Sequence, residues 1–220
     1  MATSSGASKV SGYTYRDALR LLFILVRGSQ QIDAIVEQEW DSVFVGEKRA
    51  LAIDFWVRYP DYLADELLDR FERDCDLDAL DAARTIFENE EPDVRQVKMI
   101  RWRRGAYDDL QTSLSVLTYR GLVRSMDRGL QNGMLQHEYL SGPAARSFLD
   151  EVLRDHPALR WYEKQTRLAL SVAGTKSGSA LKDIHYRDPE YGSTPYGSII
   201  PSIRDRVRAR LRKLEEKQDG

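Results

Sequence analysis

The stretch YRGLVRSMDRGLQNGMLQHEYLSGPAARSFLDEV, from Tyr119 to Val152, contains the pattern that decides the fold. A helix stops at Gly121, and two short, partly alternating runs, LVRSMDR and MLQHEYL, follow it. Between them is a turn that includes Gly129, Asn132 and Gly133. Alternation on both sides of a Gly-bearing turn is typical of an antiparallel hairpin. Ser141 then suits the N-cap of a further helix. We therefore expect a β-hairpin between Leu122 and Leu140.

The residues before the hairpin predict a helix over 107–119, because their apolar side chains recur at helical spacing on one stripe. Earlier segments, among them 15–26, also have helical patterns. Helix, helix, hairpin and helix in close succession are typical of a winged-helix domain, although other folds contain the same run. The predicted fold class is mainly α (α+β): a winged-helix-like domain with a two-stranded hairpin wing and additional flanking helices.

Three regions are expected along the chain. Residues 1–14 are small and polar, which predicts a disordered lead-in. Residues 15–173 form the helical winged-helix-like domain, with an acidic insertion around 65–93. Residues 174–220 comprise an arm rich in Gly, Ser, Pro and Tyr, expected to be irregular and to order only against a partner, and a basic C-terminal helix.

Charge changes sign at Pro92. From 65 to 93 there are twelve Asp and Glu residues against three Arg, and the run RQVKMIRWRR that follows has no acid. Its arginines, together with those of the hairpin, suggest a basic rim that contacts DNA phosphates without reading sequence. The predicted phosphate contacts are Arg101, Arg103, Arg104, Arg124 and Arg128. In the alternative interpretation these arginines pair with the acidic insertion.

The tail IRDRVRARLRKLEEK predicts a basic helix with one apolar stripe. Such a helix could lie along DNA, dock on an acidic partner surface, or present a solvated face. Docking is favoured because an isolated helix of this length is marginal in water. The predicted partner-docking residues are Trp102, Val207, Arg208, Leu211, Arg212 and Leu214.

The presumed recognition helix separates two functional classes. Its outward face offers Asp108, Asp109, Gln111, Thr112, Ser113 and Ser115, and no Lys or Arg occurs in it before Arg120. Carboxylates facing a phosphate backbone oppose the electrostatic attraction that supplies most DNA affinity. A protein-binding adaptor is therefore favoured over a winged-helix DNA-binding transcriptional regulator, which remains the alternative.

The sequence has no recognisable catalytic, cofactor or metal site. Neither dinucleotide nor Walker phosphate-loop spacing occurs, and His137, His156 and His185 are scattered and cannot join the single Cys75 in a known zinc spacing. We expect a non-enzymatic protein without cofactor. A hydrolase or nuclease would need an acidic metal site assembled from distant residues.

Composition favours a folded, cytoplasmic protein. The chain has 220 residues, 42% of them apolar, and a formal net charge of −2, so attraction to nucleic acid must come from local patches. We expect no association with a membrane and a reducing compartment, because no signal-peptide pattern or bilayer-length apolar run is evident and one cysteine cannot form an internal disulfide.

The runs LRLLFILV, ALAIDFWVRYPDYL, RWRRGAYDDLQTSLSVLTYRGLVR and HEYLSGPAARSFLDEVL resemble, in layout and apolar pattern, the middle component of bacterial ABC-three-component systems. That group includes the small accessory subunit of Lamassu-type anti-phage defence. The resemblance covers roughly residues 15–173. It implies a non-catalytic adaptor that binds an SMC- or Rad50-like ATPase and links it to an effector nuclease in DNA sensing. Non-specific contact with double-stranded DNA would be secondary.

Overall fold

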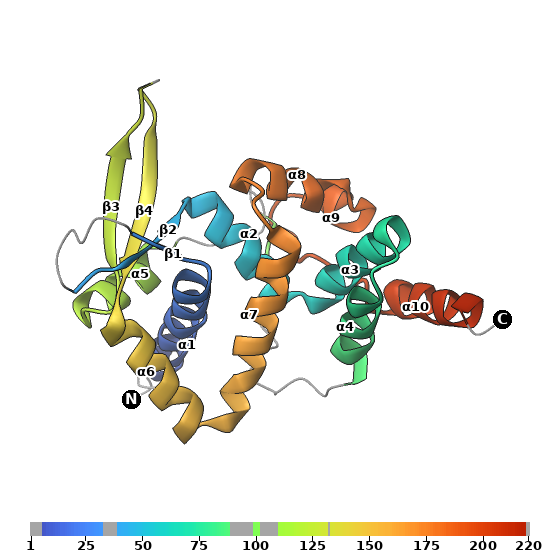
Figure 1. Cartoon of the computed structure of the whole chain (residues 1–220), viewed down its shortest axis with the longest axis horizontal. Coiled ribbons are helices and arrows are strands. Elements are labelled where there is room, and N and C mark those ends of the chain that lie inside the picture. Colours follow the sequence, from blue (N-terminus) through green and yellow to red (C-terminus); the bar gives the residue numbers. More distant parts are fainter. Residues whose placement is uncertain (1–5, 33–38, 89–98, 102–109, 132, 219–220) are drawn as a thin grey trace.

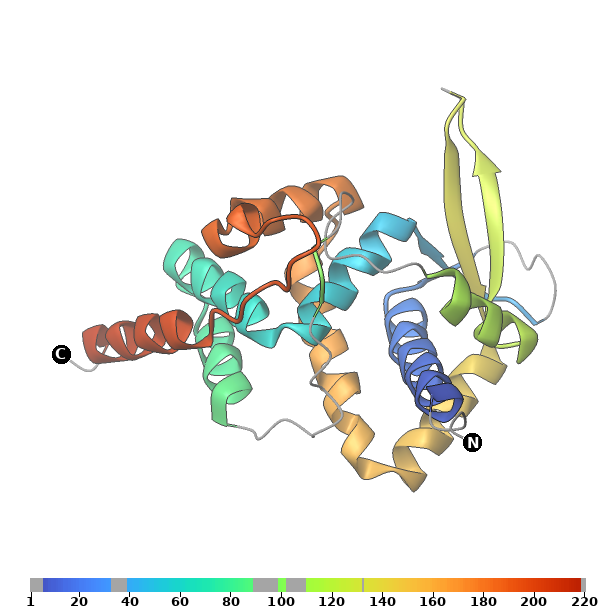
Figure 2. The same ribbon diagram turned by 180° about the vertical axis from the view of Figure 1, so that it is seen from behind.

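The computed structural model describes residues 6–32, 39–88, 99–101, 110–131 and 133–218. These residues form a mainly helical molecule with one small antiparallel sheet (Figure 1), which confirms the α+β class. The hairpin lies at one end of the molecule and the last helix at the other (Figures 1 and 2).

The predicted hairpin is present as β3 (Arg124–Gly129) and β4 (Leu135–Ser141). Gly133 in its turn has a φ of 77°, which favours glycine. Two strands that were not predicted, β1 (Gln30–Gln31) and β2 (Ser42–Val45), extend the sheet in the order β1-β2-β4-β3. They are too short to give a clear alternating pattern, and β2 forms because Phe44 is buried opposite Tyr139 of β4.

Helix α1 (Gly6–Arg27) is central to the core and packs against α2 (Glu47–Arg58) and α5 (Gln111–Tyr119). Every side chain from Leu21 to Val26 is buried, which confirms a helix buried on most sides. The helix begins at Gly6 and not near residue 15, so the expectation of disorder up to residue 14 is wrong for residues 6–14. A polar start is compatible with helix because it extends an element that is anchored further along.

The acidic insertion is a helical hairpin of α3 (Pro60–Asp74) and α4 (Leu77–Glu88); residues 89–93 lie outside the described residues. Beyond the hairpin the chain continues through α6 (Pro143–Asp155), the short helix η2 (Pro157–Leu159) and α7 (Arg160–Ala173). Helix α7 packs on α1, α2 and α3 and so joins the half of the molecule that contains the hairpin to the half that contains the acidic insertion.

Residues 174–201 are not the irregular arm that their composition predicts. They contain α8 (Gly178–Arg187) and α9 (Pro189–Ser193), and α8 packs on α2. The aromatic rings of Phe55, Tyr62 and Tyr191 pack together there, with ring centroids 5.1–6.4 Å apart. Two short helices offer too few residues for a visible period, and their ends are set by caps: Ser177 and Asp188 each accept a backbone hydrogen bond.

The last helix, α10 (Arg204–Gln218), packs on α3 and α4 of its own chain. The segment that leads to it runs beside residues 99–101 (Figure 2), where Ile200 N–H donates to Met99 O at 3.0 Å. None of the helices within the described residues has the length and apolar character required to cross a membrane.

Candidate interaction surface

The hairpin exposes apolar side chains in an unusual concentration. All six residues of β3 are exposed. The exposed fractions of the hairpin's apolar residues are 38% for Met126, 36% for Leu130, 59% for Met134 and 65% for Leu135. These four residues are called the hairpin surface below. Most other large apolar side chains of the described residues are buried in the core, so the hairpin surface is the strongest candidate for contact with another molecule.

Strand pairing assigns the hairpin side chains to two faces. Arg124, Met126 and Arg128 of β3 lie opposite Leu140, Glu138 and Gln136 of β4 and share one face. On that face the buried Glu138 carboxylate accepts hydrogen bonds from Gln136 at 2.9 Å and from Arg128 at 3.4 Å. The two predicted phosphate contacts of the wing, Arg124 and Arg128, are therefore exposed on one face, and Arg128 is partly neutralised by Glu138.

On the other face Phe44 and Tyr139 are buried at the base of the hairpin. Further along the hairpin His137 lies between two carboxylates: Nδ1 is 2.7 Å from Asp127 and Nε2 is 3.6 Å from Glu47. These contacts fix the His137 ring and tie the hairpin to α2. The hairpin is thus attached at its base, while its far end is free to contact other molecules.

Arg101 is not part of an exposed basic rim. Arg101 is only 8% exposed, and its guanidinium donates to the carbonyl oxygens of Gly192, at 2.7 Å, and Thr194. The same guanidinium lies 5.2 Å from the centre of the Tyr196 ring. The prediction that Arg101 contacts phosphate is therefore wrong, because the side chain holds the segment after α9 in place. Arg103, Arg104 and Trp102 lie outside the described residues, as do Asp108 and Asp109.

The predicted docking stripe of the tail is already occupied. Val207, Leu211 and Leu214 are buried against their own chain, so their expected role in docking a separate partner is wrong. Arg208 lies over the Phe87 ring, 5.5 Å from its centre, and Arg212 donates to Arg208 O at 3.4 Å. The tail does dock on an acidic surface, but that surface is α3 and α4.

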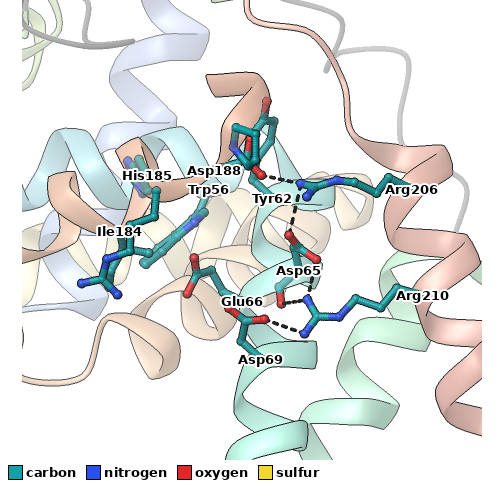
Figure 3. Close-up of a pocket in the computed structure, with 12 residues that line it drawn as sticks. Trp56, Tyr62, Asp65, Glu66, Asp69, Ile184, His185, Asp188, Arg206 and Arg210 are labelled. Carbon is teal, nitrogen blue, oxygen red and sulfur yellow. Dashed lines mark hydrogen bonds and ion pairs between the residues drawn. The ribbon is translucent and has the colours of Figure 1, made fainter. Parts of the chain in front are cut away.

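Two arginines of α10 bind the acidic insertion directly (Figure 3). Arg210 donates to Asp65 at 2.7 Å and to Asp69 at 2.5 Å, and it also contacts Glu72. Arg206 lies 3.2 Å from Asp65 and also contacts Asp188 at the start of α9. The alternative interpretation of the sequence was that the arginines around the hairpin pair with the acidic insertion. In the structure, arginines of α10 form ion pairs with it.

A cavity of about 470 Å³ lies between these elements, and sequence reasoning missed it. Its lining residues are Trp56, Tyr62, Asp65, Glu66, Asp69, Ile184, His185, Arg187, Asp188, Pro189, Arg206 and Arg210. The sequence signal that pointed to this cavity was the opposite charge of residues 65–93 and of the tail. Opposite charge alone does not identify which faces of the helices meet.

Burial controls the electrostatics of this cavity. Burial, reinforced by Asp69 and Asp65, raises the pKa of Glu66 to about 7. Figure 3 draws no interaction line to Glu66, and no hydrogen bond or ion pair joins it to another described residue. Burial also lowers the pKa of His185 to about 3, so this imidazole is neutral near pH 7. The carboxylates of the cavity wall therefore serve mainly as partners for the arginines of α10.

The part of the chain that the structure describes has no group of three or more His, Cys, Asp or Glu side chains placed to hold a metal ion. The two surfaces differ in chemistry: the hairpin exposes apolar and charged side chains, and the acidic cavity contains internal ion pairs.

Comparison with models of known protein families finds none that matches the chain, and searches of curated proteins and of solved structures find no match either. The residues of this chain are therefore the basis for assigning a function.

Proposed function

We propose that the protein is a non-catalytic adaptor subunit that holds another polypeptide through its hairpin. The observation that carries this proposal is the hairpin surface: Met126, Leu130, Met134 and Leu135 are all exposed on an element that extends from the helical body (Figure 1), with Met126 on one face of the hairpin and Leu135 on the other. Exposed apolar groups gathered on one projection are typical of protein-binding sites, and flexible Met side chains adapt well to a partner surface.

The arrangement around the wing supports a winged-helix-like domain. Helix α1, strand β2, helix α5 and the hairpin occur in this order along the chain, with α2, α3 and α4 between β2 and α5. In the sheet, β4 lies between β2 and β3. The helix that would enter a DNA groove, α5, has the sequence QTSLSVLTY, without a single charged residue. Its exposed residues are polar or aromatic, and Ser113, expected on the outward face, is buried. Such a helix favours protein contact over phosphate contact.

The identity of the partners rests on the resemblance to ABC-three-component middle subunits. On that basis the polypeptide held by the hairpin is an SMC- or Rad50-like ATPase, and the adaptor links it to an effector nuclease in bacterial anti-phage defence. Of the five predicted phosphate contacts, Arg124 and Arg128 are both described and exposed. Within that complex these two arginines are suited to non-specific phosphate contact.

One observation favours a second candidate, a winged-helix transcriptional regulator. The strand order β2-β4-β3 and the exposed arginines on β3 suit a wing that lies along a DNA backbone. A regulator would select one operator sequence from a random DNA library, and substitutions in α5 would abolish that selection. An adaptor would show weak binding that depends on salt and not on sequence.

The proposal is tested by co-purification with an SMC-like ATPase encoded beside this chain. The double substitution Met134→Ser and Leu135→Ser should remove the ATPase from the complex while the unfolding midpoint stays unchanged. The matched control is Phe148→Ser, which removes another exposed apolar side chain, 39% exposed on α6. Equal retention of the ATPase by both variants would count against the hairpin surface, and a wild-type chain that never binds the ATPase would overturn the proposal.

A further inference from the structure

Strand β3 ends the sheet with an open edge. The order is β1-β2-β4-β3, and no strand pairs with the far side of β3 in the described part of the chain. We propose that an extended acidic segment of the partner adds to this edge as a fifth strand. The inference rests on the proposed function, since it specifies how the hairpin holds its partner.

The backbone groups available at this edge follow from two hydrogen bonds. Leu130 N–H donates to Met134 O at 2.8 Å, and Gly46 N–H donates to His137 O at 2.9 Å. In an antiparallel sheet, successive residues point their N–H and C=O groups to opposite sides of the strand. His137 therefore points towards β2, and its pairing partner Asp127 points away from β4. By the same alternation Ser125, Asp127 and Gly129 present their backbone groups to the open edge.

The side chains at the edge specify the partner's sequence. Arg124, Met126 and Arg128 share one face, at alternate positions. Residues directly opposite one another in a sheet lie on the same face, with Cβ atoms about 5 Å apart. The added strand should therefore place an acid opposite each arginine and an apolar residue opposite Met126. The resulting pattern, acid-x-apolar-x-acid, reads the same in both strand directions.

A second copy of this chain fits the edge less well. In the fully overlapping antiparallel register, which centres on Met126, Arg124 of each copy would lie opposite Arg128 of the other. Like charges directly opposite one another destabilise a strand pair, and charged edges are a common protection against self-association. Charge complementarity thus favours an acidic strand from another protein.

The first experiment uses synthetic peptides with a Glu-x-Leu-x-Glu core and measures binding to the full chain by fluorescence anisotropy. The double variant Arg124→Glu and Arg128→Glu should bind this peptide about tenfold more weakly. The same variant should gain affinity for a Lys-x-Leu-x-Lys peptide. The control is Arg154→Glu together with Arg160→Glu, which changes two exposed arginines away from the hairpin and should leave both affinities unchanged. Failure of the variant to exchange its peptide preference would overturn the inference.

The second experiment tests the backbone pairing. Peptide amides are N-methylated one position at a time, which removes a donor without altering charge. Methylation should block binding at every second position only, because alternate amides face β3. Equal effects at all positions would overturn the strand-addition geometry, as would a wild-type chain that dimerises through the Arg124 edge.

The two proposals fail differently. If Met134→Ser with Leu135→Ser releases the ATPase while Arg124→Glu with Arg128→Glu retains it, the strand-addition inference is wrong and the adaptor function stands. If the acidic peptide binds the edge with the predicted alternation but no ATPase co-purifies, strand addition stands and the proposed partner is wrong.

Discussion

The guanidinium of Arg210 lies 2.7 Å from the carboxylate of Asp65, although 145 positions separate the two residues in the chain. Burial raises the pKa of Asp65 above its usual value, and Arg210 limits this rise by favouring the ionised form. The contact therefore joins α10 to α3 and makes the acidic insertion compatible with a folded core.

Arg210→Gln should lower the free energy of unfolding by about 1–2 kcal/mol, because three carboxylates lose a partly buried partner. The loss should be smaller in high salt, which screens the interaction in the wild-type chain. Urea unfolding at two salt concentrations measures both effects. Arg212→Gln is the matched control, since Arg212 is exposed and contacts only a backbone oxygen. Equal stabilities of the two variants would contradict this account.

Asp54→Asn should be more damaging, at about 3–5 kcal/mol, because it removes the buried carboxylate that pairs with two arginines in the core. Arg20 keeps its second ion pair, with Asp17 at 2.8 Å. Asp54 lies 2.5 Å from Arg20 and 2.9 Å from Arg58. Burial alone would raise the pKa of Asp54, but Arg20 and Arg58 outweigh it and hold the pKa below its usual value.

The pH dependence of this variant has a defined sign. The contribution of Asp54 is fully present above the pKa of an unfolded aspartate, about 4, and is lost as the pH falls through the lower folded-state pKa. The wild-type advantage over Asp54→Asn should therefore shrink only in acid. Denaturant titrations from pH 3 to pH 7 check this, and Asp74→Asn, at an exposed ion pair with Arg73, is the control expected to show little change.

Glu66 should destabilise the protein as the pH rises. Its pKa rises from 4.5 to about 7 on folding, so between these values the unfolded chain releases a proton that the folded chain retains. Each increase in pH within that window favours unfolding, and the accumulated cost is on the order of 2 kcal/mol after allowance for partial exposure. Glu66→Gln should match the wild type near pH 4.5 and exceed its stability at pH 8. A stability difference that stays constant over this range would refute the pKa assignment.

Gly142→Ala should lower stability by about 1–3 kcal/mol or more through steric overlap. A Cβ at this position would lie 1.9 Å from the Glu39 backbone oxygen. Backbone atoms cannot move aside as easily as the end of a flexible side chain, so the overlap is not relieved cheaply. Gly129→Ala is the matched control, because a Cβ there meets nothing within 4 Å. Thermal unfolding of the two variants distinguishes them, and similar midpoints would show that the α6 junction has room to adjust.

Local pattern was sufficient to predict the hairpin and the part of α1 from residue 15 to residue 26. The hairpin follows from alternation around a Gly-bearing turn. The nearly unbroken apolar run before Arg27 requires burial on most sides, which places this helix in the core. In both cases the residues that decide the structure are neighbours in sequence, so propensity and burial act together.

Long-range pairing was not predictable from the same patterns. Arg101 is one of several arginines in a basic run, and nothing local shows that it turns inward to the carbonyl of Gly192. The apolar stripe of α10 is buried, but on α3 and α4 of the same chain and not on the separate partner that was expected, because periodicity does not identify the surface that receives a helix. The cavity beside Glu66 is lined by Arg206 and Arg210 of α10, and local sequence patterns therefore could not predict it.

The long separation between Asp65 and Arg210 also has a consequence for biosynthesis. A ribosome that adds about 5–20 residues per second takes roughly 7–30 seconds to synthesise the 145 positions between them. Throughout that interval the carboxylates of Asp65, Asp69 and Glu72 lack the arginine that later pairs with them. The ion pairs at this face can therefore form only after the helix that contains Arg210 leaves the exit tunnel.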